Sequence, residues 1–411
     1  MYIHEFHVRN FLIHQNTALK LHPLTVLVGS NGGGKSALFD AFLNFSMLSR
    51  GSIRQAFGPY PFSYNSTIYR GASSVSRIRF TVELSRGPED DERLQYEIDY
   101  QQSEGCLPDP SFTIFNEKLT EVPSGNVLFD RSDPDAYPIT QSLRLDTDRS
   151  LFSAVRLAGN SPDNDLPDLL EYATKQISRV NKFRLDPYAL AAPCRIPEVS
   201  TEPVPSAMIP RIGYTGDDLA STLYYLSLTE DAALDAIRSR LRELVPEFDD
   251  FEFNTVGTDR IAFALKYNDR RETVPSVRLS SGMLIFIGLI TLVSTPNRPP
   301  ILMIEEPENG LTPQAIKLFY KSVRDLAFHS DSGQRSQVLL SSHSPFVICE
   351  AWNGDDRDFI NQVKVVEGKS VVRRFSQVIE EQRIPLGKVD GERVHLSLKT
   401  AEEVMSGRFS G

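Results

Sequence analysis

The chain has 411 residues, of which 40% are hydrophobic and 24% charged, and this composition excludes a disordered, collagen-like or disulfide-scaffold protein. Its 44 basic and 54 acidic residues give a formal net charge of −10, which excludes a protein that coats nucleic acid wholesale, because phosphate binding needs a positive field. The sequence shows no signal-peptide pattern and no apolar run of the roughly 20 residues that a membrane span needs, so we expect a cytoplasmic protein.

The first hundred residues are predicted to form strands around one helix. Residues 1–28 have strand patterns and end in the apolar run Leu24 to Val28, which is typical of a parallel strand covered on both faces. After a glycine cluster, Leu38, Phe42 and Phe45 recur at helical spacing. The runs 77–84 and 94–100 alternate apolar with polar residues and predict two strands of an antiparallel meander.

The rest of the chain is predicted to alternate between helices, strands and irregular segments. Residues 103–145 are rich in Pro, Asp and Ser and are predicted to form loops. Residues 187–210 are rich in proline and are predicted to be an irregular segment without helix or sheet. We expect helices at 165–185, 217–245, 283–294 and 314–327, strands at 261–267, 300–304 and 337–340, and a hairpin at 363–375 around Gly368.

The segment between the first buried strand and the first helix fits a phosphate-binding loop, G-x-x-x-x-G-K-[ST]. Its glycines let backbone N–H groups turn toward phosphate oxygens, and the helix that follows adds the positive end of its dipole. Lys35 is predicted to bind the β- and γ-phosphates, and the Ser36 hydroxyl to bind Mg²⁺. The residues predicted to bind ATP here are Gly29, Ser30, Asn31, Gly32, Gly33, Gly34, Lys35, Ser36 and Ala37.

A second site is predicted where the apolar strand 301–304 runs into Glu305 and Glu306. Strands that end in acids bring charge to the carboxyl edge of a parallel sheet, where ligands bind in such folds. Glu305 is predicted to hold Mg²⁺ directly or through water, and Glu306 to polarise the attacking water as a general base. Without the phosphate loop, an ordinary strand followed by a solvated acidic turn would explain the same residues.

Two further strings complete a fixed order of motifs. Leu279-Ser280-Ser281-Gly282 precedes the apolar helix, and serine and glycine at a helix start can bind an anion, although this string alone is usually a helix cap. Ser342-His343-Ser344 follows a buried strand. The order is therefore phosphate loop, Leu-Ser-x-Gly, apolar-Glu-Glu and a histidine at a strand end.

This order resembles that of the ABC-type ATPases, and specifically of their RecF/SMC/OLD branch. Further segments are similar to this branch or to its stand-alone AAA_21-type bacterial ATPases, and the resemblance covers essentially the whole chain. These segments are Val8-Arg9-Asn10-Phe11, Phe183-Arg184-Leu185-Asp186-Pro187, Gly216-Asp217-Asp218-Leu219-Ala220, Glu305-Glu306-Pro307-Glu308-Asn309-Gly310-Leu311 and Ser342-His343-Ser344-Pro345.

The resemblance implies an α/β fold, a P-loop NTPase head of the ABC type with mixed and parallel sheets, an antiparallel β subdomain and a helical lobe. A long coiled coil is not expected, because sustained heptads are missing. Length alone predicts two to three domains, but the motif order indicates one split ATPase domain over residues 1–411. Within it, 1–85 would be the N-terminal part of the nucleotide-binding lobe, 86–210 an elaboration, and 211–411 the lobe with the signature, the carboxylates and the switch histidine.

The resemblance also implies a composite active site in a homodimer that sandwiches two ATP molecules head to tail. The phosphate loop of one subunit would face Ser280, Ser281 and Gly282 of the other, and His343 would contact the γ-phosphate as a switch. Two positions depart from the usual pattern, because Glu305 stands where ABC proteins mostly have Asp and Met283 where many have Gln. Asn309 would lie in the loop that crosses the interface, Asn10 and Phe11 near the base or ribose, and Gln55 is a candidate for the glutamine that binds the metal.

The favoured function is an ATP-binding and ATP-hydrolysing dimeric switch that acts on DNA or on a separately encoded effector, in DNA maintenance or antiphage defence. One alternative is the nucleotide-binding subunit of a membrane transporter, which the long separation between Ser36 and Ser280 disfavours. Another is an OLD-like nuclease, which is disfavoured because no Asp-x-Asp follows Glu367-Gly368-Lys369. Arg77, Arg79, Arg86 and Arg93 could line a nucleic-acid groove, but a solvated strand face is the simpler interpretation.

Overall fold

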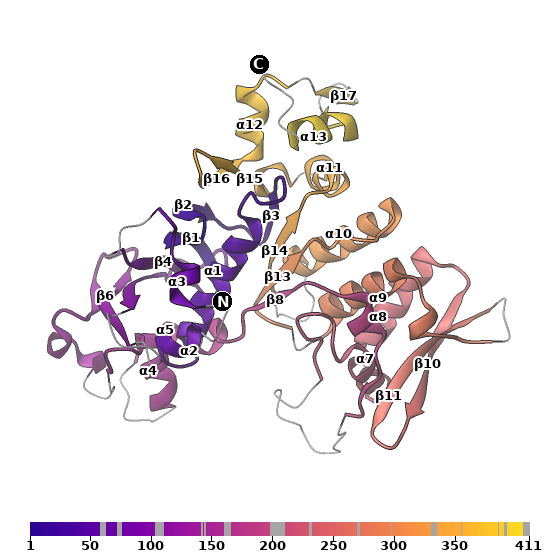
Figure 1. The fold of residues 1–411 in the computed structure, drawn as a ribbon, viewed down its shortest axis with the longest axis horizontal. Coiled ribbons are helices and arrows are strands. Elements are labelled where there is room, and N and C mark those ends of the chain that lie inside the picture. The colour runs from indigo at the N-terminus through magenta and orange to yellow at the C-terminus, as the bar shows by residue number, and fades with distance from the viewer. Residues whose placement is uncertain are drawn as a thin grey trace. The chain divides into compact units, whose positions relative to one another are not determined.

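The structure is a computed structural model, and its residues form two compact units that are described one at a time (Figure 1). The first unit comprises Met1–Val180 and Asp358–Glu381, and the second comprises Asn181–Arg357 and Gln382–Gly411. The subdivision predicted at residues 85 and 210 stays a prediction. The structure describes residues 1–57, 63–71, 76–102, 111–140, 143, 145–159, 166–197, 210–229, 232–268, 272–296, 298–329, 335–354, 356–384, 386–389 and 393–405.

The first unit contains an antiparallel sheet with the strand order β2-β1-β4-β5-β6-β7. The predicted strands at 77–84 and 94–100 are confirmed as β4 and β5, which pair with each other from Ile78–Tyr100 to Leu84–Leu94. The six strands are β1 (Tyr2–Phe11), β2 (His14–Lys20), β4 (Ile78–Ser85), β5 (Leu94–Gln102), β6 (Phe112–Glu121) and β7 (Val127–Asp130).

Aromatic side chains fill the space between this sheet and the helix α1 (Lys35–Leu48). The rings of Phe6 and Phe42 stack with their centroids 3.7 Å apart, and Phe45 meets Phe80 edge to face at 5.7 Å. Such pairs add roughly 0.5–1.5 kcal/mol each to the apolar burial. The stripe Leu38, Phe42 and Phe45 is buried as predicted, so the core fixes α1 and the loop before it against the sheet.

The loop predicted for residues 103–145 is wrong for β6 and β7, and a β-bulge explains why. Phe112 and Ile114 face the core, but Phe115 is exposed where the register with β5 shifts, so the next inward residues are Glu117 and Leu119. A bulge breaks the period of two, and a charged residue on the inner face hides the remaining alternation. Residues 103–110, within the same predicted loop, lie outside the described residues.

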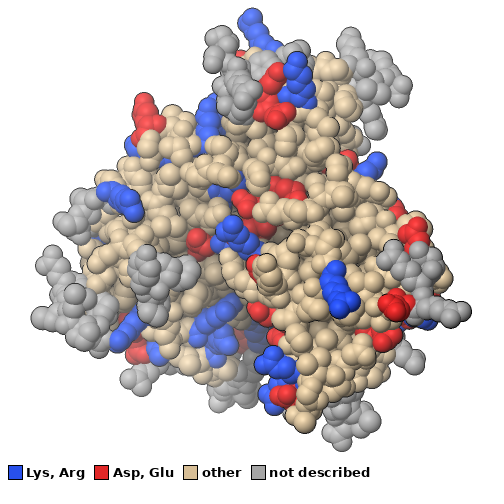
Figure 2. Space-filling view, turned by 45° about the vertical axis from the view of Figure 1, so that its right-hand side comes forward, with Lys and Arg blue, Asp and Glu red and all other residues tan. Residues whose placement is uncertain are grey.

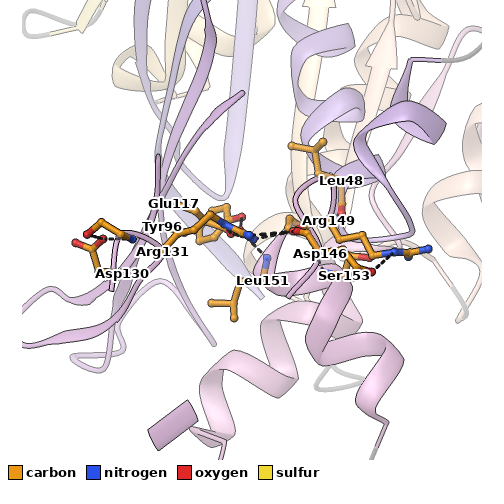
Figure 3. A network of polar contacts seen from close by, with 11 residues as sticks. Leu48, Tyr96, Glu117, Asp130, Arg131, Asp146, Arg149, Leu151 and Ser153 are labelled. Atoms are coloured by element: carbon orange, nitrogen blue, oxygen red, sulfur yellow. Dashed lines mark hydrogen bonds and ion pairs between the residues drawn. The ribbon is translucent and has the colours of Figure 1, made fainter. Parts of the chain in front are cut away.

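Glu117 is the centre of a buried polar network in this unit (Figure 3). Its side chain is fully buried and accepts hydrogen bonds from the Tyr96 hydroxyl, the Arg131 guanidinium (2.8 Å from Nε) and the backbone N–H of Leu151 (2.5 Å). Arg131 in turn donates to the backbone oxygen of Arg149 at 2.8 Å. Because these buried donors and acceptors form hydrogen bonds with one another, the network fixes the β6 strand and the start of α4 (Leu151–Ala158) to each other.

The first unit also holds three strands in the order β16-β15-β3. β3 (Leu24–Val28) is completely buried, as predicted, and β15 (Ile360–Val366) runs parallel to it with Ile360 opposite Val26. β15 and β16 (Lys369–Arg374) form the predicted hairpin, which turns at Gly368 with a φ of 77°. The remaining helices of this unit are α2 (Ile53–Ala56), α3 (Tyr64–Thr67), α5 (Asp168–Ile177) and α12 (Phe375–Glu381).

The second unit contains three parallel strands in the order β14-β13-β8. Glu305 at the end of β13 (Ile301–Glu305) lies opposite Ser341 of β14 (Gln337–Ser342), so the two strands end at the same edge. The third strand, β8 (Asn181–Phe183), corrects the helix predicted for 165–185, because α5 ends at Ile177 and residues 181–183 pair with β13. Helices α9 (Ser281–Ser294) and α10 (Pro313–Phe328) follow the signature and β13 as predicted, and the helix α11 (Pro345–Asn353), which was not predicted, follows β14.

A second, antiparallel sheet of this unit is formed by β10 (Phe248–Val256), β11 (Arg260–Tyr267), β12 (Val274–Pro275) and β9 (Cys194–Arg195). In the proline-rich segment, Pro187 stands at the first position of α6 (Pro187–Ala191), where a missing N–H costs no hydrogen bond, and residues 198–209 lie outside the described residues. The unit also contains α7 (Leu219–Leu228), α8 (Ala232–Leu244), β17 (Gly387–Val389), β18 (Arg393–His395) and α13 (Leu398–Met405).

The predicted fold class, α/β with parallel and antiparallel sheets, is confirmed. The longest helix of the described residues, α10, has 16 residues, which is too short for the arm of a long coiled coil. Within the same described residues, no helix is both long and apolar enough to cross a membrane.

Candidate functional site

The predicted phosphate loop lies in the first unit between the buried strand β3 and the helix α1. Gly34 is the N-cap of α1 with a φ of 111°, and a Cβ there would lie 2.5 Å from Ser370 Oγ, so only glycine fits this position. The first intrahelical hydrogen bond runs from Leu38 N to Gly34 O, and helix geometry therefore leaves the N–H groups of positions 35–37 directed out of the N-terminus. Ser30, Asn31, Gly32 and Ser36 are exposed, as a loop that accepts a ligand requires.

The Lys35 side chain is folded back into this loop. It is 5% exposed, and its Nζ donates to the backbone oxygens of Gly29 at 2.6 Å and Ser30 at 3.0 Å. A buried ammonium needs acceptors, and the loop's own carbonyl oxygens supply them here. The chain thus places a full positive charge inside a ring of backbone groups, which is a fitting site for phosphate oxygens.

His14 and Ser370, to which the sequence analysis assigned no role, form hydrogen bonds with backbone oxygens of the phosphate loop. His14 is fully buried, and its Nε2 lies 2.9 Å from the backbone oxygen of Gly34. Since a carbonyl oxygen only accepts, Nε2 carries the proton and Nδ1 accepts from the Thr17 hydroxyl at 3.0 Å. Ser370 on β16 donates from Oγ to Gly33 O at 2.8 Å. Burial lowers the pKa of His14, so the ring is neutral at pH 7 and its hydrogen bond to Gly34 is one between uncharged groups.

The two predicted carboxylates lie in the second unit at the end of β13. Glu305 is 4% exposed, and its Oε1 lies 3.2 Å from Nζ of Lys182, which is itself buried on the neighbouring strand β8. Lys182 lies opposite Met303, two residues before Glu305 and on the same face of the sheet, so strand register explains the contact. The pair therefore gives the proposed metal ligand a cationic neighbour from the chain itself.

Glu306 has a left-handed backbone, with a φ of 46°, which is uncommon for a residue other than glycine and recurs at functional sites. Its N–H donates to Ser341 O at 2.9 Å, which holds the turn to the end of β14. The carboxylate accepts from Asn309 Nδ2 at 3.1 Å and lies 3.8 Å from Arg184 Nη2 and 3.7 Å from His343 Nδ1. The turn thus directs Glu306 toward the other predicted polar groups of this unit and away from the path of the strand.

His343 follows β14 and has a side chain that is 40% exposed. Its backbone N–H donates to Glu308 Oε1 at 2.9 Å, and its Nδ1 lies 3.4 Å from the same oxygen. The structure therefore brings His343, Glu306 and Asn309 together and adds Glu308, Lys182 and Arg184, which the sequence analysis quoted in motifs or passed over without a role.

The signature segment of the second unit begins α9. Ser280 is exposed and is the N-cap, with its Oγ accepting from Met283 N at 3.3 Å, and Ser281 is exposed beside it. A Cβ on Gly282 would lie 2.2 Å from the backbone oxygen of Gly310, so this glycine is required by close approach of the segment after Asn309. The exposed Ser280 and Ser281 thus lie at the N-terminus of α9, where a helix can bind an anion.

The remaining predicted ligands lie in the first unit. Asn10 has a φ of 57°, donates from Nδ2 to Arg77 O at 2.9 Å and helps to line a polar hollow with Arg9, Arg77 and Asp99. Phe11 is 2% exposed and packs against Phe80, so its ring belongs to the core in this conformation. These two positions are compatible with a role of Asn10 near a ligand and give Phe11 a packing role.

Gln55 lies on the short helix α2, where its Oε1 accepts from the N–H of Ser52 at 3.0 Å as part of a capping box. That oxygen would have to leave the cap to reach a metal ion. Among the residues that the structure describes, no three or more His, Cys, Asp and Glu side chains are grouped to hold a metal. A magnesium ion would therefore need serine, water or phosphate oxygens among its ligands, which is usual for this ion.

The arginines considered for nucleic acid are mostly engaged with acids. Arg79 forms a bidentate pair with Asp99, 2.6 Å from Nε, and Arg93 lies 3.0 Å from Glu83. Arg86 lies 4.0 Å from Glu92. On the face drawn in Figure 2, basic (blue) and acidic (red) side chains are interspersed, and neither forms a broad patch on the described surface. The paired arginines favour the interpretation as a solvated strand face.

Comparisons with known proteins agree with the motif order. The sequence profile of the AAA_21 family, described as AAA domain, putative AbiEii toxin, Type IV TA system, matches residues 24–349. No curated protein sequence matches the chain. A solved structure of an SMC head bound to the C-winged helix domain of ScpA is similar with a TM-score of 0.52 and 15% identity, over 92% of this chain and 99% of that chain.

Two further SMC heads also match. One, derived from Pyrococcus furiosus, has an extended coiled coil and is bound to the C-terminal domain of ScpA, with a TM-score of 0.49, 12% identity and coverage of 93% and 99%. The other, from Thermotoga maritima, has a TM-score of 0.44, 11% identity and coverage of 91% and 99%. The match with a TM-score of 0.52 shows a fold like that of an SMC head, as the predicted resemblance to the RecF/SMC/OLD branch implied.

Proposed function

The chain belongs to the AAA_21 family of P-loop ATPases, and from this premise we propose that it binds and hydrolyses ATP as a dimeric switch. The single observation that carries the proposal is the loop after β3, where Lys35 Nζ is held by the backbone oxygens of Gly29 and Ser30. On binding ATP, Lys35 exchanges these two oxygens for those of the β- and γ-phosphates. The N–H groups at the start of α1 and the residues Gly29 to Ala37 surround the same phosphates.

Ser36 and Glu305 are the residues proposed to hold Mg²⁺, with Gln55 as a further candidate. Serine and carboxylate oxygens are the hard ligands that this ion prefers, so their chemistry fits the metal. When bound, magnesium neutralises the charge of the phosphates. Glu305 stays buried next to Lys182, so its carboxylate has a fixed direction before a metal arrives.

Glu306 is proposed to orient and deprotonate the attacking water. Its left-handed turn directs the carboxylate out of the sheet, and Asn309 donates a hydrogen bond that limits its rotation. His343 is proposed to contact the γ-phosphate, with Lys35 stabilising the charge that develops there. A carboxylate beside a histidine gives both a proton acceptor and a phosphate sensor at one strand edge.

The dimer is proposed because Ser280 and Ser281 at the start of α9 are exposed, so a second subunit could reach them. In a head-to-tail homodimer, each signature would complete the phosphate loop of the partner subunit, and one ATPase domain split over residues 1–411 would close and open with the nucleotide. Asn10, Phe11 and Asn309 would border the nucleotide or the interface.

The output of the switch is proposed to be a separately encoded effector protein or DNA. An SMC head with a similar fold has been solved with a winged-helix domain bound, which supports a protein partner. The family description names a putative toxin of a toxin–antitoxin system, which supports a role in antiphage defence over one in DNA maintenance. The interspersed charges and the net charge of −10 also favour a protein partner.

Binding of a fluorescent ATP analogue tests the proposal directly. Lys35→Ala should abolish binding, because it removes the charge inside the loop, while the matched control Lys20→Ala, an exposed lysine at the other end of β2 from His14, should bind as the wild type does. Equal affinity of Lys35→Ala and the wild type would remove the assignment of the phosphate loop.

A further inference from the structure

One carboxylate oxygen in the second unit faces three polar groups of two consecutive residues, the last residue of β14 and the residue after it. Oε1 of Glu308 accepts from Ser342 Oγ at 2.8 Å and from His343 N at 2.9 Å, and it lies 3.4 Å from His343 Nδ1. Glu308 itself lies three residues beyond the end of β13. The contact therefore joins the loop of the proposed general base to the loop of the proposed switch histidine.

Burial makes this contact strong and specific. Glu308 is 8% exposed and Ser342 is fully buried, so the carboxylate has exchanged most of its water for these donors. Hydrogen bonds to a charged acceptor are about twice as strong as neutral ones, and a buried carboxylate that loses them retains the cost of desolvation. The segment 342–343 is thus held at a fixed distance from the Glu308 carboxylate.

Further hydrogen bonds connect Ser342 to the start of α11. Ser342 Oγ accepts from Ser344 N at 3.0 Å, and Ser344 Oγ caps α11 by accepting from Phe346 N at 3.2 Å. The backbone on both sides of His343 is therefore tied, on one side to Glu308 and on the other to α11. The conformational freedom that remains in this segment is mainly that of the His343 side chain.

The ring of His343 presents Nδ1 to two carboxylates, Glu308 at 3.4 Å and Glu306 at 3.7 Å. Carboxylates that face one ring nitrogen favour the proton on that nitrogen, which leaves Nε2 as the nitrogen that is free to meet a ligand. The same contact thus selects both the place of the histidine and the tautomer of its ring.

We propose that Glu308 is a positioning residue for His343, which fixes the backbone and the ring tautomer of the switch histidine and couples it to the loop of Glu306. The inference rests on the proposed role of His343 at the γ-phosphate. It explains why an acid that is far from the phosphate loop in sequence is buried with two hydrogen-bond donors and a ring nitrogen facing one oxygen. A movement of the Glu306 loop is transmitted to His343 through this oxygen, and a movement of His343 is transmitted back.

Two substitutions separate positioning from simple packing. Glu308→Asp keeps a buried carboxylate but withdraws it by one methylene from Ser342 and His343. Glu308→Gln keeps the length and an acceptor oxygen, and its NH₂ takes the place of Oε2, which makes no hydrogen bond within the described residues. The matched control is Glu350→Asp on α11, a partly exposed acid of the same unit.

The first readout is the ¹⁵N spectrum of the imidazole nitrogens in the full-length protein without nucleotide, with the His343 signals assigned by their loss in His343→Gln. We expect the Nδ1-protonated tautomer in the wild type, in Glu308→Gln and in Glu350→Asp, and a mixture of tautomers in Glu308→Asp. Unchanged His343 signals in a folded Glu308→Asp protein would overturn the inference, whatever its melting temperature.

The second readout is steady-state ATP hydrolysis. In Glu308→Asp, kcat should fall by about tenfold to a hundredfold, as a misplacement of about 1 Å can cause, while KM changes by less than about threefold. Glu308→Gln should recover most of kcat. A Glu308→Asp enzyme with the wild-type kcat would also contradict the inference.

The two readouts keep this inference apart from the proposed function. If the wild-type protein does not hydrolyse ATP, the proposed function fails, and the imidazole spectrum still decides whether Glu308 positions His343. If the spectrum does not change while the wild type hydrolyses ATP and Lys35→Ala does not bind it, only the inference about Glu308 fails.

Discussion

Nζ of Lys182 lies 3.2 Å from Oε1 of Glu305, and both side chains are less than a tenth exposed. A buried charge without a partner is costly, and strand register places these two charges on one face of the β8–β13 pair. Glu305 is also the proposed ligand of Mg²⁺. The same carboxylate thus has one cationic neighbour from the chain and a second from the metal when that is bound.

Lys182→Met tests this relationship. Methionine fills the volume of the lysine stem and removes the charge, so Glu305 is left buried and uncompensated in the absence of metal. We expect the free energy of unfolding in EDTA to fall by about 3–5 kcal/mol, the usual cost of breaking a buried pair. Excess Mg²⁺ or Mn²⁺ should restore more stability to the variant than to the wild type, which urea unfolding with and without metal measures.

The exposed pair of Lys266 and Asp249, 2.8 Å apart, gives the matched control. Lys266→Met should leave the unfolding midpoint nearly unchanged in both conditions, because water screens this pair. The double variant Lys182→Met with Glu305→Gln should regain part of the stability of the wild type. A Lys182→Met protein with the same loss in EDTA and in Mg²⁺ would show that Glu305 does not bind the metal.

Glu306→Gln should bind ATP and hydrolyse it very slowly. The amide keeps the size of the side chain and an oxygen for Asn309, but it cannot accept a proton from water, so hydrolysis should fall by at least about a hundredfold. ATP affinity should change by less than about threefold, because Lys35 and the phosphate loop are intact. With ATP no longer consumed, the closed dimer should accumulate, and light scattering after gel filtration with ATP measures this.

The control for this variant is Glu247→Gln, an exposed glutamate of the same unit, which should hydrolyse ATP as the wild type does. Hydrolysis by Glu306→Gln at the wild-type rate would disprove the role of Glu306. A monomer that traps ATP without dimerising would instead disprove the composite site, while leaving the role of Glu306 intact.

The sequence predicts those parts of the site whose residues lie close together along the chain. The loop from Gly29 to Ser36 and the carboxylates after residues 301–304 each contain a strand, a turn and their polar groups within a few neighbouring positions. Local pattern therefore predicts them. Their positions in β3, α1 and β13 are found where expected.

The missed parts are charged residues on buried faces. Because Lys182 is charged, the sequence of β8 is predicted as the end of a helix. Glu117 and the bulge at Phe115 break the strand pattern of β6, which is therefore predicted as a loop. Each residue is acceptable only because a distant partner compensates it, Glu305 for Lys182 and Arg131 for Glu117. A single sequence does not reveal such pairs, since nothing local distinguishes a buried lysine from a solvated one.

The last prediction concerns pH and His14, the fully buried ring beneath Gly34. Burial lowers the pKa of His14 below 6.5, and the hydrogen bond to the Gly34 carbonyl offsets this only in part. Above about pH 6.5, the ring is neutral in both the folded and the unfolded chain, and the full stability is present. As the pH falls below that value, the unfolded chain takes up a proton before the folded chain does, so stability is lost until the pKa of the folded state is passed.

His14→Gln should therefore make the stability of the protein less dependent on pH below about 6.5, because glutamine can donate to Gly34 O and does not titrate. The largest difference in slope is about 1.4 kcal/mol per pH unit, which corresponds to one proton, and urea unfolding at a series of pH values measures it. His4 and His22 also have lowered pKa values and keep their own contribution in both proteins, so only the difference between the two curves is attributed to His14. Parallel curves for the wild type and His14→Gln would show that His14 does not remain neutral beneath the phosphate loop.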